Sequence, residues 1–296
     1  MLPPVLASLI DPWMFMGLAL SYLPGTILRL VVARDFRTLF SWSRFQAAWF
    51  AAFWSRVGPE VRLNATKNVL PLLQGRVTAG VVPPEDSVPS SNPNDNPHPP
   101  IHGTLLELGP GSGMWVSLFS ATSQRENRLG PIAKIYGVEP NTDVHPLLKT
   151  QVREAGLDKP SGGQTHYEIV PVGVESLAES GKVKPNSVDC IVTIMCLCSI
   201  PEPRKNMALL YNYLKPGGRW YVYEHVKCFQ HQPWGMRVYQ SFLNFLWPHI
   251  VGGCQMCRET GKWLREAGPW SQVDVHPLAD EPWYYTMPHV IGVLTK

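Results

Sequence analysis

Residues 105–113 read Leu-Leu-Glu-Leu-Gly-Pro-Gly-Ser-Gly, and this stretch indicates the fold of the 296-residue chain. The apolar run 103–108 predicts a buried strand, which three glycines follow at every second position: Gly109, Gly111 and Gly113. Glycine lets a backbone turn tightly and approach a ligand where a Cβ atom would collide with it. A helix that begins near Met114 would direct its N-terminal amide groups at the same ligand. The pattern therefore predicts a binding site for an adenosine-containing cofactor.

Two acidic residues distinguish between the cofactors that such a glycine pattern can bind. Glu107, just before the glycines, would repel the pyrophosphate of a dinucleotide but would hold the cationic amino group of a methionine. Glu139 ends the apolar run 133–138, the expected second strand, where one carboxylate can accept hydrogen bonds from both hydroxyl groups of a ribose. Its distance from Gly109 exceeds the usual spacing of about 20 residues, which predicts an insertion over 123–129 after the first helix. Together, the two acids favour S-adenosylmethionine over NAD.

Further apolar runs predict the rest of a sheet. The run 187–195 is almost continuously apolar, as is typical of a strand that is covered on both faces. Residues 214–225 indicate a helix end, a Pro-Gly-Gly turn and a fifth strand. The other expected strands are 167–172, 271–277 and 289–294. Because strands alternate with helical stretches, we expect an α/β fold: a Rossmann-like, doubly wound sheet of seven mostly parallel strands, with the ligand at their carboxyl ends.

Composition and charge limit the partners and place the domain boundaries. The net charge of +3 is too small and too dispersed to indicate a nucleic-acid partner. We expect the cofactor-binding domain over 102–296, a connecting helix and linker over 58–101, and a hydrophobic helical segment over 1–57. The stretch 83–100 is rich in Pro, Asn and Ser, cannot repay its ordering entropy by burial, and is expected to be mobile.

The cysteines indicate buried thiols in a reducing compartment rather than a disulfide framework, because several lie in or beside apolar strands. The pair Cys254 and Cys257, set against Cys196 and Cys198, raises the alternative of a zinc site. However, Cys196 and Cys198 are expected at the end of a core strand that faces the cofactor cleft. We therefore predict no metal site.

The N-terminal segment is apolar and aromatic. Residues 12–28 are 17 positions without a charge, and a helix of that length spans about 25 Å, less than the roughly 30 Å of a hydrocarbon core. Pro24 and Gly25 interrupt it. Residues 36–56 then combine aromatic side chains with arginines, which suits the headgroup region. We expect a monotopic membrane anchor over 1–57, a hairpin or half-span followed by an in-plane helix; the alternative is a hydrophobic lid over the site or a dimer interface.

With these motifs, the chain resembles the class I S-adenosylmethionine-dependent methyltransferases. Within that class it is similar to the microsomal alkyl-thiol S-methyltransferases in three places: Leu197-Cys198-Ser199-Ile200, Glu224-His225-Val226 and Gly253-Cys254. Those proteins carry an N-terminal membrane anchor, so the resemblance implies a cytosol-facing protein on the endoplasmic reticulum or lipid droplets. The chain departs from the family at Pro110, where a cysteine is usual, and at Glu139, where an aspartate is usual.

The resemblance implies transfer of a methyl group to a small lipophilic acceptor, with a thiol as the favoured nucleophile. A thiol needs little activation, since its pKa lies near 8.5. A hydroxyl acceptor would need a base, for which His225 is the candidate, although a structural histidine there is an equal alternative. Cys198 and Ser199 are candidates for the acceptor side, with Cys198 favoured as a packed wall residue. Two alternatives stay open: an O-, N- or C-methyltransferase of a lipophilic metabolite, and a non-catalytic membrane or lipid-droplet protein with this fold.

The predicted cofactor contacts follow the parts of S-adenosylmethionine. Glu107 is assigned to the ammonium group, the three glycines to close backbone approach, and Glu139 to the ribose. The remaining predicted contacts are Pro140 and Asn141 beside the ribose, Val174 and Glu175 at the adenine edge, and Met195 and Cys196 at the end of the fourth strand.

Overall fold

The computed structural model describes residues 3–84, 95–159 and 165–296. Much of the predicted linker, residues 85–94, lies outside the described residues. The part that follows it packs against the domain: Ile101 is fully buried, and His98 makes a buried ion pair with Asp274, with Nε2 and Oδ2 2.7 Å apart. Residues 95–101 are therefore part of the domain.

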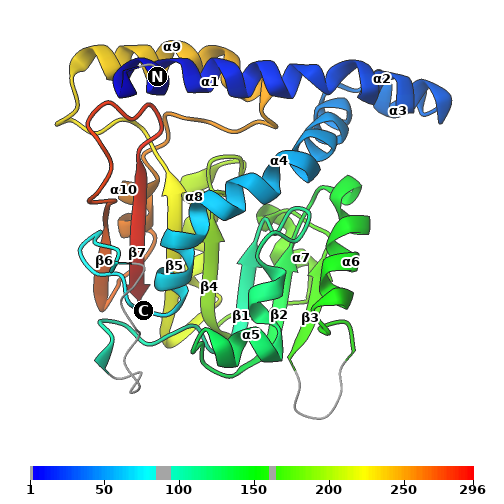
Figure 1. Ribbon diagram of the computed structural model, residues 1–296. Helices are drawn as coiled ribbons and strands as arrows, with labels where there is room; N and C mark the ends of the chain where they lie inside the picture. The colour runs from blue at the N-terminus through cyan, green and yellow to red at the C-terminus, as the bar shows by residue number, and fades with distance from the viewer. Residues whose placement is uncertain (1–2, 85–94, 160–164) are drawn as a thin grey trace.

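A seven-stranded sheet forms the centre of the molecule (Figure 1). Its strand order is β3-β2-β1-β4-β5-β7-β6, in which β7 pairs antiparallel with both β5 and β6 and the other pairs are parallel. The predicted α/β fold with a mostly parallel sheet is confirmed. The strands are β1 (Gly103–Leu108), β2 (Ile132–Val138), β3 (His166–Val170), β4 (Val188–Ile194), β5 (Leu214–His225), β6 (Gln272–Pro277) and β7 (His289–Thr295).

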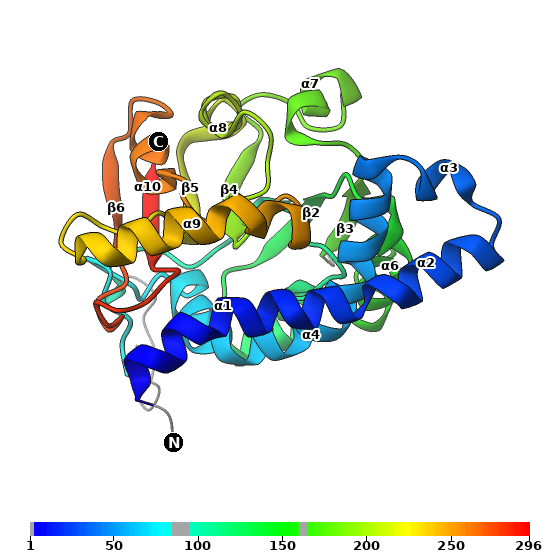
Figure 2. The same ribbon diagram turned by 90° about the horizontal axis from the view of Figure 1, so that it is seen from above.

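Helices cover both faces of this sheet, so that it separates two hydrophobic cores. Adjacent side chains of a strand point to opposite faces: Leu105 of β1 packs into one core and Leu106 into the other. Figure 2 shows α4 and α6 on one side and α7, α8 and α10 on the other. These helices are α4 (Trp42–Leu73), α6 (His145–Glu154), α7 (Leu177–Ser180), α8 (Pro203–Tyr211) and α10 (Thr260–Glu266).

Two local expectations were wrong. No helix begins at Met114: the chain turns through Gly113, whose φ is +92°, into a 3₁₀ helix, Val116–Phe119, and then α5, Ala121–Glu126. Three glycines with positive φ keep this segment in turns, and α5 occupies part of the predicted insertion. In addition, residue 214 does not end a helix, since β5 begins there and includes the Pro-Gly-Gly sequence.

The N-terminal helices lie across the carboxyl edge of the sheet, beside α9 (Trp234–Ile250) (Figure 1). The helices α1 (Pro4–Ser21) and α2 (Leu23–Val32) meet at Tyr22, whose own backbone is helical. Pro24 lies in the first turn of α2, where proline is tolerated, and does not interrupt the segment as expected.

Together α1 and α2 form an apolar segment of 29 residues, within which an 18-residue stretch has a mean hydropathy of 1.6. By length and composition it could cross a membrane, because 29 residues of helix span about 43 Å. The expectation that the segment is too short to cross a hydrocarbon core was wrong, because α1 and α2 together extend beyond the uncharged run 12–28 at both ends.

The expected helix over 36–56 is two helices. A short α3 (Phe36–Leu39) is separated from α4 by Phe40 and Ser41, and α4 then continues for 32 residues, through the expected domain boundary at residue 57. Phe45, Trp49 and Phe53 of α4 are buried, although Trp42 at its start is exposed. Trp49 Nε1 donates to the carbonyl oxygen of Ala19, 2.8 Å away. The N-terminal segment is therefore packed onto the domain.

Candidate active site

A cavity of about 440 Å³ lies at the carboxyl ends of the strands, the edge predicted for the ligand. Helices from the N-terminal segment and α9 cover it: Phe15 of α1, Phe50 and Trp54 of α4, and Trp247 of α9 line its wall. The α1 and α4 helices therefore cover the site as a lid, which was the alternative interpretation of the N-terminal segment. The sequence analysis did not identify these four residues.

The strand order arranges the lining residues in a row. Glu139 follows β2, Gly109 follows β1, Met195 follows β4 and His225 ends β5, and these four strands are neighbours in the sheet. We call the part beside β2 and β1 the cofactor end. The part beside the end of β5 is the acceptor end, and it includes Cys198, His225, Cys254, Phe15, Phe50 and Trp247.

The glycines of the loop after β1 have two different functions in the fold. Gly109 and Gly111 line the cavity with φ of +58° and +57°, and a Cβ on Gly109 would lie 2.8 Å from the Cβ of Cys196. Gly113 does not line it: a Cβ there would lie 2.9 Å from the Cβ of Gln151 in α6. Gly109 and Gly113 thus allow neighbouring segments to pack closely, and Gly111 leaves the cavity wall without a side chain.

Glu107 is buried behind the cofactor end and does not itself line the cavity. Its side chain is 2% exposed, and Oε2 accepts a 2.6 Å hydrogen bond from the Tyr167 hydroxyl. Oε1 has no hydrogen-bond partner within the described chain. Burial raises the pKa of this carboxyl to about 7. A buried carboxylate oxygen without a partner suits a cationic group.

Glu139 lines the cavity and organises the backbone around it. Oε2 accepts from the amide of Gly111 at 2.9 Å and Oε1 from the amide of Asn141 at 2.8 Å. Burial raises the pKa of this carboxyl. The Asn141 side chain in turn donates to the carbonyl oxygen of Ala47 in α4. Pro140 and Asn141 also line the cavity, as do Val174 and Glu175 after β3.

The loop after β4 brings Met195, Cys196, Cys198 and Ser199 to the cavity. Met195 has a φ of +52°, a conformation that is uncommon without glycine and that clusters at functional sites.

Glu224, which the sequence analysis did not select, fixes this loop. It is fully buried in β5 and accepts hydrogen bonds from the amides of Cys196, at 3.1 Å, and Leu197, at 3.2 Å. Burial raises the pKa of the Glu224 carboxyl to about 7. From the other side, Arg258 donates to the carbonyl oxygens of Leu197 and Ile200. An acidic residue directly after the apolar and aromatic run 220–223 was the available sequence signal.

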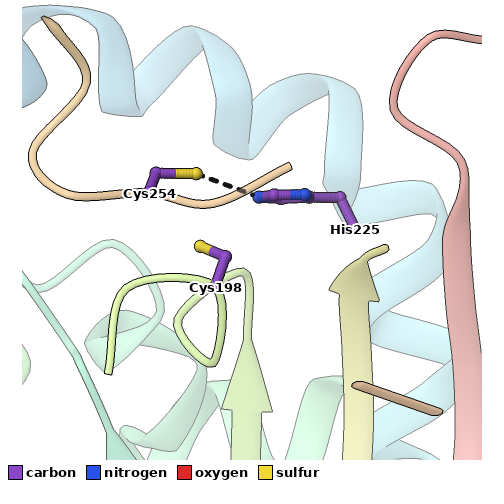
Figure 3. A group of neighbouring side chains, drawn as sticks. All are labelled: Cys198, His225 and Cys254. Carbon is purple, nitrogen blue, oxygen red and sulfur yellow. Dashed lines mark hydrogen bonds between the residues drawn. The ribbon is translucent and has the colours of Figure 1, made fainter. Parts of the chain in front are cut away.

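Two of the three candidate catalytic residues, Cys198 and His225, meet Cys254 at the acceptor end, while the third candidate, Ser199, lines the cavity beside them. Cys198, His225 and Cys254 lie on three segments and point toward one another (Figure 3). They are 4%, 7% and 8% exposed, and His225 Nε2 lies 3.2 Å from Cys254 Sγ. Contact with Cys254 and burial raise the pKa of the Cys198 thiol well above its usual range. Cys198 lines the cavity wall, which is where the favoured interpretation of this residue places it.

The four cysteines of the zinc alternative are not gathered together. Cys196 Sγ faces Glu224 Oε1 at 3.6 Å, and Cys257 Sγ lies 3.7 Å from Gln240 Oε1. Within residues 3–84, 95–159 and 165–296, the side chains close enough to hold a metal ion are instead Cys198, His225 and Cys254. The prediction of no metal site did not consider this group, because the sequence pattern compared cysteines alone.

Comparison with known proteins gives the family. A methyltransferase domain model matches residues 87–268. The chain is 31% identical to thiol S-methyltransferase TMT1B of Rattus norvegicus, over 65% of this chain and 70% of that protein. It is 25% identical to thiol S-methyltransferase TMT1A of Homo sapiens, over the same shares of each chain. A solved structure of the [4+2]-cyclase SpnF is 18% identical, covers 65% of this chain and 74% of its own, and has a TM-score of 0.45.

The sheet order, the glycine loop and these matches agree with the resemblance found in the sequence. The chain therefore belongs to the class I S-adenosylmethionine-dependent methyltransferases and, within them, to the family of the thiol S-methyltransferases.

Proposed function

We propose that this methyltransferase methylates the sulfur atom of a small lipophilic thiol. The observation that carries the proposal is the acceptor end itself, where aromatic and aliphatic side chains surround a buried group of two thiols and one imidazole. The relatives named thiol S-methyltransferases support the same acceptor. Such a chamber favours a desolvated, polarizable nucleophile over a hydrated one.

The cofactor end would hold S-adenosylmethionine along the row of strand ends. The free Oε1 of Glu107 suits the ammonium group, and Gly109 and Gly111 allow the backbone to lie against the cofactor. Glu139 receives the ribose hydroxyls with the lone pairs that its two amide contacts leave free. Pro140 and Asn141 border the ribose, Val174 and Glu175 border the adenine, and Met195 and Cys196 separate the two ends.

When bound, S-adenosylmethionine supplies a methyl group on a positively charged sulfur. The chain positions the acceptor in line with that methyl group and excludes water, which accounts for most of the acceleration in such a displacement. Phe15 stacks on Trp247 with ring centroids 5.5 Å apart, and Phe50 stacks on Trp54 at 5.4 Å. Phe15, Phe50 and Trp247 enclose the acceptor end and fix the position of an alkyl chain, whereas Trp54 reaches Gly111 at the cofactor end.

The second candidate is methylation of a hydroxyl acceptor. His225 favours it, because its Nδ1 is buried without a partner within the described chain and could take a proton.

A series of straight-chain thiols and the matching alcohols and amines tests the proposal. With detergent-solubilised full-length protein, we expect turnover of thiols only, measured as S-adenosylhomocysteine formation. The value of kcat/KM should rise about fourfold for each added CH₂ group, at about 0.8 kcal/mol each, until the acceptor end is filled. Turnover of alcohols or amines at comparable rates would overturn the thiol assignment, and faster alcohol turnover would favour His225 as a base.

We also propose that the outer faces of α1, α2 and α9 rest on a membrane, on the cytosolic side of the endoplasmic reticulum or of a lipid droplet. Large apolar side chains are exposed along all three helices, among them Met14, Leu28 and Phe245, which is 76% exposed. Trp13 of α1 and Phe242 of α9 bring the two faces into contact, with ring centroids 6.2 Å apart. A lipophilic thiol could then enter from the membrane.

This arrangement favours a helix that lies in the membrane plane over one that crosses the membrane. The α1 helix is fixed to the domain by hydrogen bonds: Trp13 Nε1 donates to the Tyr239 hydroxyl at 2.7 Å, and the Ser8 hydroxyl donates to the Tyr284 carbonyl oxygen at 2.9 Å. Phe245→Glu should weaken binding to phospholipid vesicles, whereas Leu209→Glu on α8 should not. Equal binding of the two variants would refute the α9 contribution.

A further inference from the structure

The group of Cys198, His225 and Cys254 has the dimensions of a zinc site. Its sulfur and nitrogen atoms all lie within 4.8 Å of one another, and no ion is present. Tetrahedral zinc, with bonds of about 2.3 Å to sulfur and about 2.0 Å to nitrogen, places its ligand atoms about 3.5–3.8 Å apart. The separation of 3.2 Å between His225 Nε2 and Cys254 Sγ is close to that value. A small adjustment of side chains would therefore bring the three atoms to bonding distance.

Cys198 and Cys254 are held by hydrogen bonds outside the group, and the His225 ring packs edge-on against His289, with ring centroids 6.4 Å apart. Glu224 and Arg258 fix the loop of Cys198, as described above. The segment of Cys254 is joined to that loop, because the amide of Gln255 donates to the Cys198 carbonyl oxygen at 3.0 Å. It is also joined to α9, because Asn244 Oδ1 accepts from the amide of Met256 at 2.6 Å. Preformed supports of this kind are what a metal site needs.

The number of ligands distinguishes a catalytic from a structural site. Structural zinc is closed by four protein ligands, whereas catalytic zinc has three and keeps one position open. All three residues line the cavity that Gly109, Gly111 and Glu139 also line. The open position would therefore face the space in which the acceptor must meet the cofactor.

We propose that Cys198, His225 and Cys254 bind a zinc ion whose fourth position is taken by the sulfur of the acceptor. The inference rests on the proposed function for the identity of that fourth ligand. Two thiolates neutralise the charge of the ion, so the added acceptor thiolate makes the site anionic. In an anionic site, the acceptor sulfur keeps electron density and faces the sulfonium of S-adenosylmethionine. Zinc undergoes no redox change in this step.

The step balances without a further reactant. The acceptor thiol loses its proton to solvent when its sulfur binds zinc, since zinc takes the thiolate. The sulfur then forms a bond to the methyl carbon of S-adenosylmethionine. The bond from that carbon to the sulfonium sulfur breaks, and its electron pair stays with S-adenosylhomocysteine. The product is a neutral thioether, a weaker zinc ligand than a thiolate, and it leaves the open position.

The test measures metal content and a spectroscopic signature. Full-length protein is purified in detergent under reducing conditions, and its zinc is determined by mass spectrometry. Zinc is then exchanged for cobalt, whose charge-transfer bands report thiolate ligands. We expect about one ion per chain, thiolate bands, and a change in the cobalt d–d spectrum when hexanethiol is added but not when hexanol is added.

Variants locate the site. Cys254→Ser and Cys198→Ser should each lower the zinc content at least tenfold, whereas Cys257→Ser, which removes the other cysteine of the Cys254–Cys257 pair, should retain it. Cys254→His keeps a ligand and should retain part of the metal. Binding of S-adenosylmethionine to every variant verifies that the fold survives.

The outcomes are separable from those for the proposed function. Protein with reduced thiols and no bound zinc after zinc is added, or zinc retained in Cys254→Ser, would overturn the site. A cobalt spectrum that hexanethiol leaves unchanged would overturn the role of the fourth position. Thiol turnover by protein without metal would overturn the inference but leave the proposed function intact. Metal binding without thiol turnover would overturn the proposed function and the role of the fourth position, but would leave the three-residue metal site intact.

Discussion

The cofactor end and the acceptor end of the cavity are built in different ways. The cofactor end consists of backbone and of acids that directly follow or end parallel strands, such as Gly109, Gly111 and Glu139. The acceptor end combines side chains from α1, α4, α9 and the segment around Cys254, which are distant in sequence. The cofactor end therefore depends on local backbone geometry, and the acceptor end depends on how distant helices pack. Variants at the two ends should affect different binding constants.

Gly109→Ala should have the largest effect, confined to the cofactor end. Its Cβ would lie 2.8 Å from the Cβ of Cys196, in a backbone with a φ of +58°. Overpacking of about 1–3 kcal/mol and backbone strain of about 1 kcal/mol should be relieved by a shift of the glycine loop away from Cys196. The shifted loop should bind S-adenosylmethionine about 100-fold more weakly, a loss of about 2.7 kcal/mol. Isothermal titration calorimetry measures the change.

The matched control is Gly156→Ala. Gly156 has a φ of +70°, but a Cβ there would meet nothing within 4 Å. The Gly156→Ala substitution therefore imposes the same kind of backbone strain without a collision. We expect it to leave the affinity for S-adenosylmethionine unchanged. Similar losses in both variants would show that strain, rather than close approach at the cofactor end, is responsible.

Glu139→Ala should weaken cofactor binding by about 10- to 100-fold. It removes the proposed ribose contact and the acceptor for the Gly111 and Asn141 amides, and hydrogen bonds to a charged group contribute about 1.5–3 kcal/mol. The control is Glu179→Ala, an exposed residue of α7. Unchanged affinity with an intact circular dichroism spectrum would refute the ribose assignment.

Phe50→Ala should act on the acceptor end alone. Phe50 lies against Gly252, next to the Cys254 segment, and a Cβ on Gly252 would lie 2.5 Å from its ring. We expect KM for hexanethiol to rise about tenfold, through lost apolar contact of about 1.5 kcal/mol, while the affinity for S-adenosylmethionine stays the same. Steady-state kinetics and calorimetry on one preparation measure both quantities. A parallel loss of cofactor affinity would show that the two ends are not separate.

The smallest effect is a pH dependence from Glu107. Burial raises the pKa of this carboxyl to about 7, above its usual value of 4.5. The folded protein therefore binds more protons than the unfolded chain between these values, so this group's contribution to stability is present below pH 4.5 and is lost as pH rises to 7. A cationic ligand relieves the buried charge, and cofactor affinity should rise several-fold between pH 5.5 and 7.

Glu107→Gln should abolish that rise in affinity, measured by calorimetry at three pH values. Glu224→Gln is the control, because burial raises the pKa of Glu224 to about 7 as well, but this residue supports the loop after β4 rather than the cofactor end. The same slope in the Glu107→Gln variant as in the parent protein would contradict the assignment to the ammonium group.

The contrast between the two ends explains what the sequence could predict. Local signals predict the strands and the residues at their ends. An apolar run that is followed by glycine or an acid indicates a strand whose carboxyl end faces the ligand of an α/β fold. Even there, the turn at Gly113 replaced a helix, because three positive φ angles depend on the loop as a whole.

The acceptor end had no comparable local signal. Residues 36–56 suggested a headgroup helix, yet Trp49 is buried and Phe50 and Trp54 line the cavity. Hydropathy alone cannot separate a helix that faces lipid from one that faces a substrate. In the same way, Cys198, His225 and Cys254 become neighbours only through the pairing of β4 with β5 and the return of the chain after α9.

The most direct test of the account offers both nucleophiles in one molecule. Full-length protein in detergent is given labelled S-adenosylmethionine and 6-mercaptohexanol, and the position of the label is read by mass spectrometry. Both groups then share one alkyl chain and one binding site, so affinity cannot decide the result. The account predicts label on sulfur only; label on oxygen would contradict a thiol-specific acceptor end.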